Sequence, residues 1–320
     1  MSRTQDIHTQ DIRNGNAFCG PTFCGRACSR FIVALGLVSA AACGSTTSTK
    51  VSSSSSRGAS VSSIKSTIAA PGTTSAAPGA ATKSGFEQAK WSSGVTISFS
   101  DGTITFKSNG IPNHLRQQQY ALPNAGVRIP SASTAYAADD PTVAQTYQFT
   151  ITTNPKKAST TTSASLGTIG VMISGAALFN PYEGDGATVA TSSNFTVKDA
   201  VGKDVAFLDS CSGHPTPMGQ YHYHALPSCI TATIDTSDGP SHILGIAFDG
   251  FPIYGDHDIS GKIITAGQLD SCNGINSATP EFPKGTYHYV LLNTTDASSS
   301  IKCFSGTVDA SLVHLMPGMP

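Results

Sequence analysis

The chain has 320 residues and a formal net charge of -1, and only 12% of its residues are charged. Proteins that bind nucleic acid concentrate positive charge on one face or along a groove, so this balance excludes nucleic acid as an expected partner. No apolar run approaches the roughly 20 residues of a mature membrane-spanning helix. We therefore expect any attachment to a membrane to be made through a lipid.

Residues 1–42 have the layout of an export signal with a long n-region. Arg26 and Arg30 precede the short apolar segment 31–42, which ends in small residues. Cys43 follows, and residues 40–43 resemble a bacterial lipobox in which Ala replaces the usual Leu or Val. The resemblance implies that Cys43 carries a lipid and that the protein is an exported lipoprotein, anchored at the periplasmic or cell-surface face of a membrane. An ordinary secretory signal cleaved nearby is the alternative.

Composition divides the rest of the chain into two parts. Residues 43–85 consist mainly of Ser, Thr, Ala, Gly and Pro. A segment of this kind buries too little apolar surface to offset the entropy lost on ordering. We therefore predict a flexible linker over 43–85 and one folded domain over 86–320.

The folded region contains short strand signals from its start to its end. The segments 95–99 and 103–106 alternate in polarity around Ser100-Asp101-Gly102, a pattern typical of a β-hairpin. Runs rich in β-branched and aromatic residues predict further strands at 147–153, 168–174, 230–234, 243–248, 263–265 and 287–292. We predict no amphipathic helix of 12 residues or more. The expected fold class is all-β, as a sandwich or barrel.

An internal repeat indicates that this domain has two related halves. The segment 208–213, Leu-Asp-Ser-Cys-Ser-Gly, recurs at 269–274 as Leu-Asp-Ser-Cys-Asn-Gly. Each copy is preceded by a strand signal that ends in Gly and is followed by Gly-x-Tyr-His-Tyr. We therefore predict two repeat units in one domain, at about 168–230 and 243–303.

The same repeat constrains the cysteines of the folded region. Cys211, Cys229, Cys272 and Cys303 are an even number, and an oxidising compartment makes pairing their expected state. Four cysteines allow three connectivities. Equivalence of the repeats favours Cys211 with Cys229 and Cys272 with Cys303, and thiolate metal ligation is the less favoured alternative because the region has no Cys-x-x-Cys pair.

The histidines form the most informative pattern in the chain. In 221–224, Tyr-His-Tyr-His, the period of a strand places both Tyr on one face and both His on the other. His222 and His224 can then share one metal ion, and His288 is the equivalent of His222 in the second unit. If the halves pack about a pseudo-twofold axis, these three imidazoles converge, with His214 as a fourth ligand. Ligands of this type suit copper, with zinc as the alternative.

A second group of polar residues surrounds the turn at 250–255. Asp249, Asp256, His257 and Asp258 are candidates for groups that orient a ligand imidazole or for a separate hard-cation site. His114, which follows the first hairpin, is a further candidate. Solvated turn residues are the alternative for all five.

The segment from about 109 to 303 resembles the YHYH-domain proteins. The motif that names them is Tyr-His-Tyr-His at 221–224, and the resemblance extends to 108–114, 179–182, 208–215 and 245–255. It implies an exported or surface-associated domain and implies no particular activity.

Three functions are consistent with this sequence. The first is a lipid-anchored metal-binding protein, for copper, in uptake, buffering or delivery. The second is a metal-dependent extracytoplasmic enzyme, although the Gly-x-Ser-x-Gly, His-Glu-x-x-His and phosphate-loop signatures are absent. The third is a carbohydrate-binding or structural module in which the histidines form hydrogen bonds in the core and tyrosines stack on a ligand at the surface, namely Tyr221, Tyr223, Tyr254, Tyr287 and Tyr289.

Overall fold

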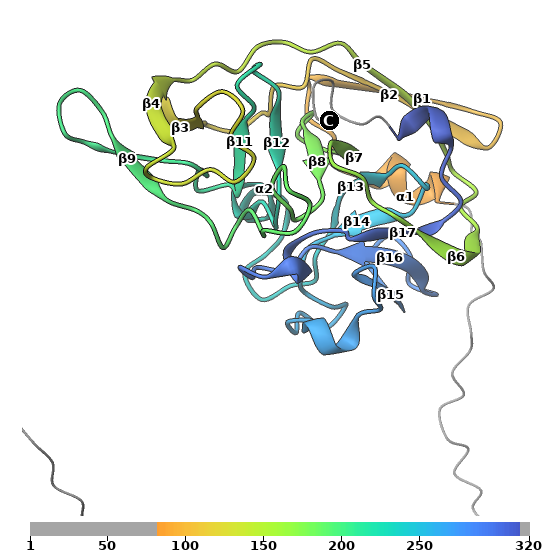
Figure 1. Cartoon of the computed structure of the whole chain (residues 1–320). Coiled ribbons are helices and arrows are strands. Elements are labelled where there is room, and N and C mark those ends of the chain that lie inside the picture. The colour runs from red at the N-terminus through yellow and green to blue at the C-terminus, as the bar shows by residue number, and fades with distance from the viewer. Residues whose placement is uncertain (1–81, 314–320) are drawn as a thin grey trace, which may run out of the picture. The chain divides into compact units, whose positions relative to one another are not determined.

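The computed structural model describes residues 82–313, and these residues form a predominantly β structure with short helices only (Figure 1). The longest helix is α2 (Ser228–Ile234), and α1 (Lys83–Gln88) is shorter. The 3-10 helices are η1 (Ala266–Gln268), η2 (Ala297–Ser299) and η3 (Ala310–Leu312). The expected all-β, sandwich-like class is confirmed. Within 82–313, no helix combines the length and apolar character needed to cross a bilayer.

The predicted export signal, the predicted lipidation of Cys43 and most of the predicted linker lie outside the described residues. The folded region begins earlier than the sequence indicated. Thr82 is fully buried, and its backbone N–H donates to the carbonyl of Thr153 over 2.8 Å. Phe86, four residues later, is also fully buried and belongs to the main core. Residues 82–85 therefore belong to the domain and not to the linker.

One eight-stranded sheet contains both repeat units. Its strand order is β11-β12-β8-β7-β13-β14-β16-β15. The first unit contributes β7 (Thr168–Met172), β8 (Ala177–Phe179), β11 (Gly213–Pro215) and β12 (Tyr221–Tyr223); the second contributes β13 (Ile243–Ala247), β14 (Pro252–Tyr254), β15 (Gly274–Ser277) and β16 (Thr286–Val290). Outward from the centre, the two halves repeat the same sequence of strands. The predicted duplication is therefore visible as a pseudo-twofold arrangement within a single sheet.

The two halves meet where β7 pairs antiparallel with β13. Gly170 lies opposite Ala247, and the equivalent Gly245 lies opposite Met172. A Cβ added at Gly170 would come within 2.8 Å of the Ile246 carbonyl oxygen, and one added at Gly245 would clash with the Val171 carbonyl oxygen. The absence of a side chain at these two positions therefore permits the close approach on which the junction depends.

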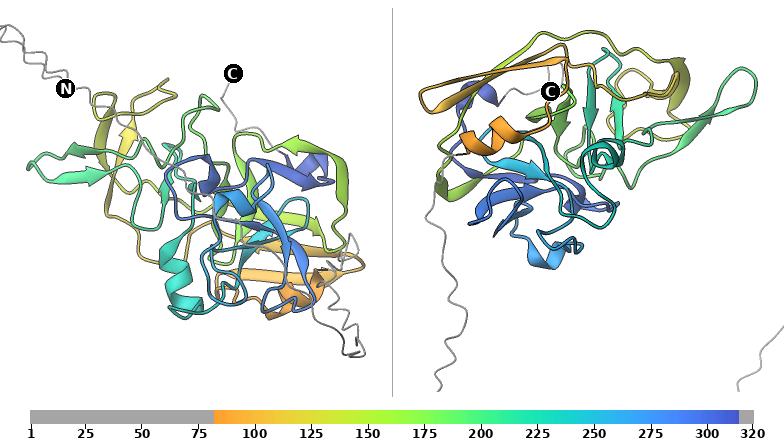
Figure 2. Two further views of the ribbon diagram at one scale, coloured as in Figure 1. Left: turned by 90° about the horizontal axis from the view of Figure 1, so that it is seen from below. Right: turned by 180° about the vertical axis from the view of Figure 1, so that it is seen from behind.

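Smaller sheets complete the fold. β1 (Val95–Ser100), β2 (Thr103–Ser108) and β5 (Tyr147–Thr152) form a three-stranded sheet. The pairs are β3 (Gln119–Pro123) with β4 (Ala135–Asp139), β9 (Thr196–Lys198) with β10 (Asp204–Ala206), and β6 (Lys157–Ser163) with β17 (Cys303–Gly306). Two further views show the β9–β10 hairpin extending outward (Figure 2). Inward side chains of β2 and β5 share one core with those of β7 and β13, which gives the sandwich-like packing.

Of the strands predicted from the sequence, some are confirmed and others are not. The hairpin at 95–106 is confirmed, with Gly102 at a φ of +68° in the turn. The predicted strand at 230–234 was wrong, because this segment belongs to α2. Ile230 and Ile234 both pack on the main core, and their spacing of four fits a helix as well as a strand. The segment 263–265 forms only an isolated bridge, between His257 and Ile263.

Both predicted disulfides are present, Cys211–Cys229 and Cys272–Cys303. Each joins the repeated Leu-Asp-Ser-Cys loop to a later segment, α2 in the first half and β17 in the second. The bonds therefore enclose the Tyr-His-Tyr strand of each half.

Replacing Gly170 or Gly245 by Ala tests the junction between the halves. We expect each change to lower the free energy of unfolding by about 1–3 kcal/mol, because a methyl group has to displace backbone at a tightly packed crossing. Gly267→Ala is the matched control, since a Cβ there meets nothing within 4 Å. Urea denaturation measures all three. Equal stability of Gly245→Ala and Gly267→Ala would contradict this account of the junction.

Candidate metal centre

The hairpin of β11 and β12 is positioned by the loop that precedes it. Asp209 Oδ1 accepts hydrogen bonds from the backbone N–H of Cys211 over 2.8 Å and of Gly213 over 3.2 Å. Ser212, between them, has a φ of +59°, and its carbonyl accepts the backbone N–H of His224 over 3.1 Å. The second half has the same arrangement around Asp270. The repeated Leu-Asp-Ser-Cys motif is therefore a structural cap for the hairpin.

The tyrosines of the motif lie on the face that points toward this cap. The Tyr221 hydroxyl donates to Asp209 Oδ2 over 2.7 Å, and Tyr120 donates to the same oxygen over 2.9 Å. The Tyr223 hydroxyl lies 2.9 Å from Ser174 Oγ. Four of the five tyrosines proposed as surface stacking groups are buried, and Tyr287 is partly buried. The four buried tyrosines cannot stack on a ligand at the surface, so the predicted set of five surface tyrosines does not form.

The histidines of the motif lie on the opposite face, where a third imidazole joins them. His214 on β11 is the cross-strand partner of His222 on β12. His222 Nε2 lies 2.9 Å from His224 Nε2, and His214 Nε2 lies 3.3 Å from the same atom. The three side chains are buried, with exposed fractions of 7%, 2% and 3% for His214, His222 and His224. We call these three residues the His triad.

Backbone carbonyls hold two of the three rings in one orientation. His224 Nδ1 lies 2.8 Å from the carbonyl oxygen of Asn180, and His222 Nδ1 lies 3.2 Å from that of Gln220. A carbonyl oxygen only accepts, so these contacts favour the tautomer with the proton on Nδ1. The Nε2 lone pairs of His222 and His224 then face each other. His214 Nδ1 is buried and has no hydrogen-bond partner within the described residues.

Aromatic rings enclose the triad. The Phe179 ring stacks on His222 with centroids 3.9 Å apart, and the Phe207 ring lies 4.3 Å from that of His214. Burial lowers the pKa of all three imidazoles below the usual value for histidine, that of His224 to about 4. The low pKa values therefore disfavour protonation as the means of removing the repulsion between the facing Nε2 lone pairs.

The spacing of the triad fits coordination of one metal ion. Imidazole nitrogens bind zinc or copper at about 2.0–2.1 Å, which separates two ligands of a tetrahedral ion by about 3.3 Å. The observed separations of 2.9 and 3.3 Å are close to this value. The carbonyl contacts of His222 and His224 are those that orient metal-bound imidazoles in other proteins. His214, His222 and His224 are thus able to hold a metal together.

His288 does not join them. It lies on β16, and four strands separate β16 from β12 in the sheet. Its Nδ1 lies 3.1 Å from the Thr286 carbonyl oxygen, as the Nδ1 of His222 does with Gln220. In the second half, however, Ile275 and Val290 occupy the positions of His214 and His224. The expected convergence of His222, His224 and His288 fails because the halves lie side by side in one sheet and do not face each other.

A family model described as YHYH protein matches residues 148–262 and 260–306. The chain belongs to the YHYH family. The region matched by the YHYH model contains the His triad, both disulfides and both copies of the repeat. No curated protein and no solved structure matches the chain.

The other candidate residues lie elsewhere in the YHYH domain. Asp256 Oδ1 pairs with His257 Nδ1 over 2.9 Å, and the side chain of His257 is one-third exposed. Asp258 accepts hydrogen bonds from Ser260 and Lys262 within its own turn. None of these residues belongs to the His triad. Asp256 is buried, His257 and Asp258 are partly buried, and these contacts are local to the turn.

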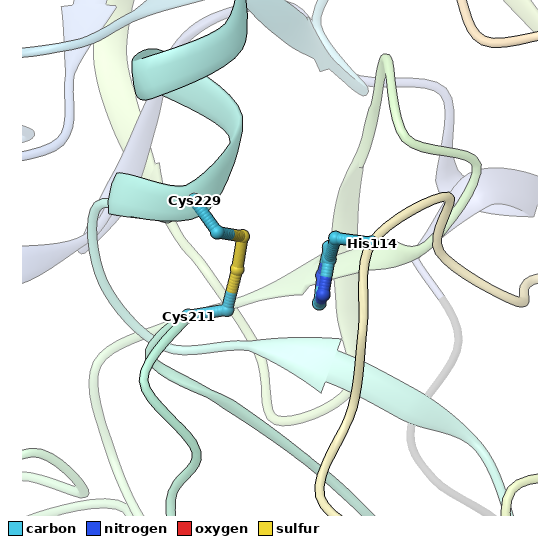
Figure 3. Close-up of side chains that lie close together, drawn as sticks. All are labelled: His114, Cys211 and Cys229. Carbon is cyan, nitrogen blue, oxygen red and sulfur yellow. A yellow bond between two sulfur atoms is a disulfide. The ribbon is translucent and has the colours of Figure 1, made fainter.

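His114 lies on the tyrosine face of the hairpin. Its Nε2 is 2.7 Å from the Tyr223 hydroxyl, and its ring lies beside the Cys211–Cys229 disulfide (Figure 3). The two sulfur atoms are bonded to each other, so they are not thiolate ligands. His114 is therefore a hydrogen-bonding partner of Tyr223 and does not contact the His triad.

Sequence reasoning missed the groups that support the triad. Asn180 and Gln220 act through backbone carbonyls, which leave no signal in side-chain type. Phe179 and Phe207 lie outside the Tyr-His-Tyr-His motif. The signal that pointed to Asp209 was its duplication as Asp270, which marks a residue needed in both halves.

Asp249 has a structural role in the second half of the YHYH domain. It occupies the position equivalent to Ser174 in the repeat, and it accepts hydrogen bonds from the Tyr289 hydroxyl over 2.5 Å and the Gly306 N–H over 2.9 Å. Burial raises the pKa of Asp249 to about 6, although these hydrogen bonds lower it in part. The folded state therefore binds this proton more tightly than the unfolded state does.

Asp249→Asn tests the pKa of this buried carboxyl. Because the folded-state pKa is raised, the contribution of Asp249 to stability is complete below about pH 4 and is lost as the pH rises to about 6. Between pH 4 and pH 6 the free energy of unfolding of the wild type should fall by about 2–3 kcal/mol relative to that of Asp249→Asn. Urea denaturation at both pH values measures this difference, with the exposed Asp238→Asn as control. Parallel pH profiles of the wild type and Asp249→Asn would contradict the shift.

Proposed function

We propose that this protein is an exported, lipid-anchored metal-binding protein, and that it holds one copper ion at His214, His222 and His224 for uptake, buffering or delivery. The observation that carries the proposal is the convergence of three buried imidazole Nε2 atoms with separations of 2.9 and 3.3 Å. The burial of the ring nitrogens and the carbonyl partners of His222 and His224 add support.

The alternative, a set of core histidines that bond only to one another, leaves an electrostatic conflict. With both Nδ1 atoms protonated, the Nε2 lone pairs of His222 and His224 repel across 2.9 Å. Moving one proton to Nε2 removes that repulsion but places a bare Nδ1 against a carbonyl oxygen instead. A cation between the two Nε2 atoms removes their repulsion and leaves the Nδ1 protons on the carbonyl oxygens. The lowered pKa values of His222 and His224 disfavour a proton as that cation.

Copper is the ion that this donor set favours on general grounds. Imidazole nitrogen is among the ligand types that suit copper. A structural zinc site also takes four protein ligands, whereas the triad supplies three. Zinc is the alternative that the first experiment has to exclude.

Sequence features of exported proteins support the proposed location at the membrane. The signal-like residues 1–42 and the lipobox-like segment ending at Cys43 support delivery to the outer face of a membrane. The two disulfides also suit an oxidising compartment. A lipid anchor would keep a metal-binding domain next to the membrane that the metal has to cross.

The duplicated half provides an internal control for the metal site. His288 is buried like His222 and occupies the equivalent strand position, but it lacks the two partner histidines. We expect His222→Ala with His224→Ala to reduce copper from about one ion per chain to near zero, because one imidazole cannot hold the ion alone. His288→Ala should keep the full amount. Elemental analysis of protein purified from the periplasm without a His tag measures the metal content.

Two further readouts make the result decisive. Near-ultraviolet circular dichroism and non-reducing peptide mapping show whether each variant is folded with both disulfides. Loss of metal in the folded double variant, but not in His288→Ala, supports the proposal. A wild-type protein that is free of metal and takes up neither copper nor zinc would sink it, as would equal losses in both variants.

A further inference from the structure

The enclosure of the His triad restricts the charge of its ion. The three side chains are almost fully buried, and phenylalanine rings lie against two of them. Ions pay a large desolvation cost in such surroundings, and for a given radius this cost grows with the square of the charge. A divalent ion therefore costs about four times as much to bury as a monovalent ion of similar size.

The donors of the triad bring no compensating negative charge. All three ligands are neutral imidazoles, and within residues 82–313 the cluster of possible ligands around them contains no carboxylate and no thiolate. Asp209 lies across the hairpin, where its carboxylate accepts the hydroxyls of Tyr120 and Tyr221. A divalent ion at the triad would keep its full double charge in an apolar environment, whereas a monovalent ion would keep a single charge.

The number of donors points the same way. Cu(II) favours four or more nitrogen and oxygen ligands in a tetragonal arrangement, and zinc favours four. The paired strands β11 and β12 carry His214 and His222, and His224 follows directly after β12, so three nitrogens are supplied. Phe179 and Phe207 lie against the rings that carry two of them. Cu(I) has a filled d shell and is satisfied by three ligands. Charge and coordination number thus select the same ion.

We infer that the His triad binds copper as Cu(I), in a closed three-imidazole site that excludes Zn²⁺ and Cu(II). This inference rests on the proposed function and specifies its cargo. The site then serves to hold and transfer a reduced ion, because no ligand position is left for a substrate.

Anaerobic competition for Cu(I) tests the inference. The wild-type protein, stripped of metal, is titrated with Cu(I) in the presence of a colorimetric Cu(I) chelator, alone and with about a tenfold excess of Zn²⁺. We expect one Cu(I) per chain, with Zn²⁺ causing no displacement. His288→Ala should behave as the wild type, and His214→Ala should weaken Cu(I) binding at least about tenfold, because two ligands remain.

Electron paramagnetic resonance gives the second readout. Protein exposed to Cu(II) in air and then desalted should show no stoichiometric nitrogen-ligated Cu(II) signal. A stoichiometric signal that disappears in His222→Ala, or displacement of Cu(I) by equimolar Zn²⁺, would overturn the inference but leave the proposed metal site in place. Failure of the wild type to bind Cu(I), Cu(II) or Zn²⁺ would overturn both.

Discussion

The period of two along residues 221–224 determines where the chemistry of this protein lies. Successive side chains of a strand point to opposite faces. Tyr221 and Tyr223 therefore lie on the face of the Asp209 cap, and His222 and His224 lie on the opposite face, against the Phe179 ring and the Asn180 carbonyl. A shift of one residue would exchange these faces and leave four buried polar groups without partners. The capped loop and the Cys211–Cys229 bond fix the register on which both faces depend.

Duplication explains the framework of the site, and within residues 82–313 only the first half carries three clustered histidines. The pseudo-twofold sheet repeats the cap, the tyrosine–aspartate bond and the disulfide in each half. These shared features are the structural framework. The His triad is the difference between the halves, since Ile275 and Val290 replace two of its members in the second half. A feature that one copy lacks without loss of the fold is not needed for the fold, and this favours a function for the triad.

Much of the framework was predictable from local sequence. The first hairpin, the two disulfides, the two-unit organisation and the pairing of His222 with His224 follow from turn chemistry, from repeat equivalence and from strand period. The location of His288 could not be predicted, because an internal repeat looks the same in the sequence whether the two halves pack side by side or face to face. The segment 230–234 was misassigned because the spacing of Ile230 and Ile234 fits two periods. The carbonyls that orient the triad belong to the backbone, and side-chain type does not reveal them.

The most direct test of the central claim observes the imidazole nitrogens themselves. Long-range proton–nitrogen correlation spectra, recorded before and after addition of one equivalent of Cu(I) or Zn²⁺, report the tautomer of each ring and the nitrogen that binds the ion. The account predicts protons on Nδ1 of His222 and His224, large shifts of the Nε2 signals of His214, His222 and His224 with the ion that binds, and an unchanged His288. Spectra in which these Nε2 signals do not move with either ion, or in which His288 shifts with them, would contradict it.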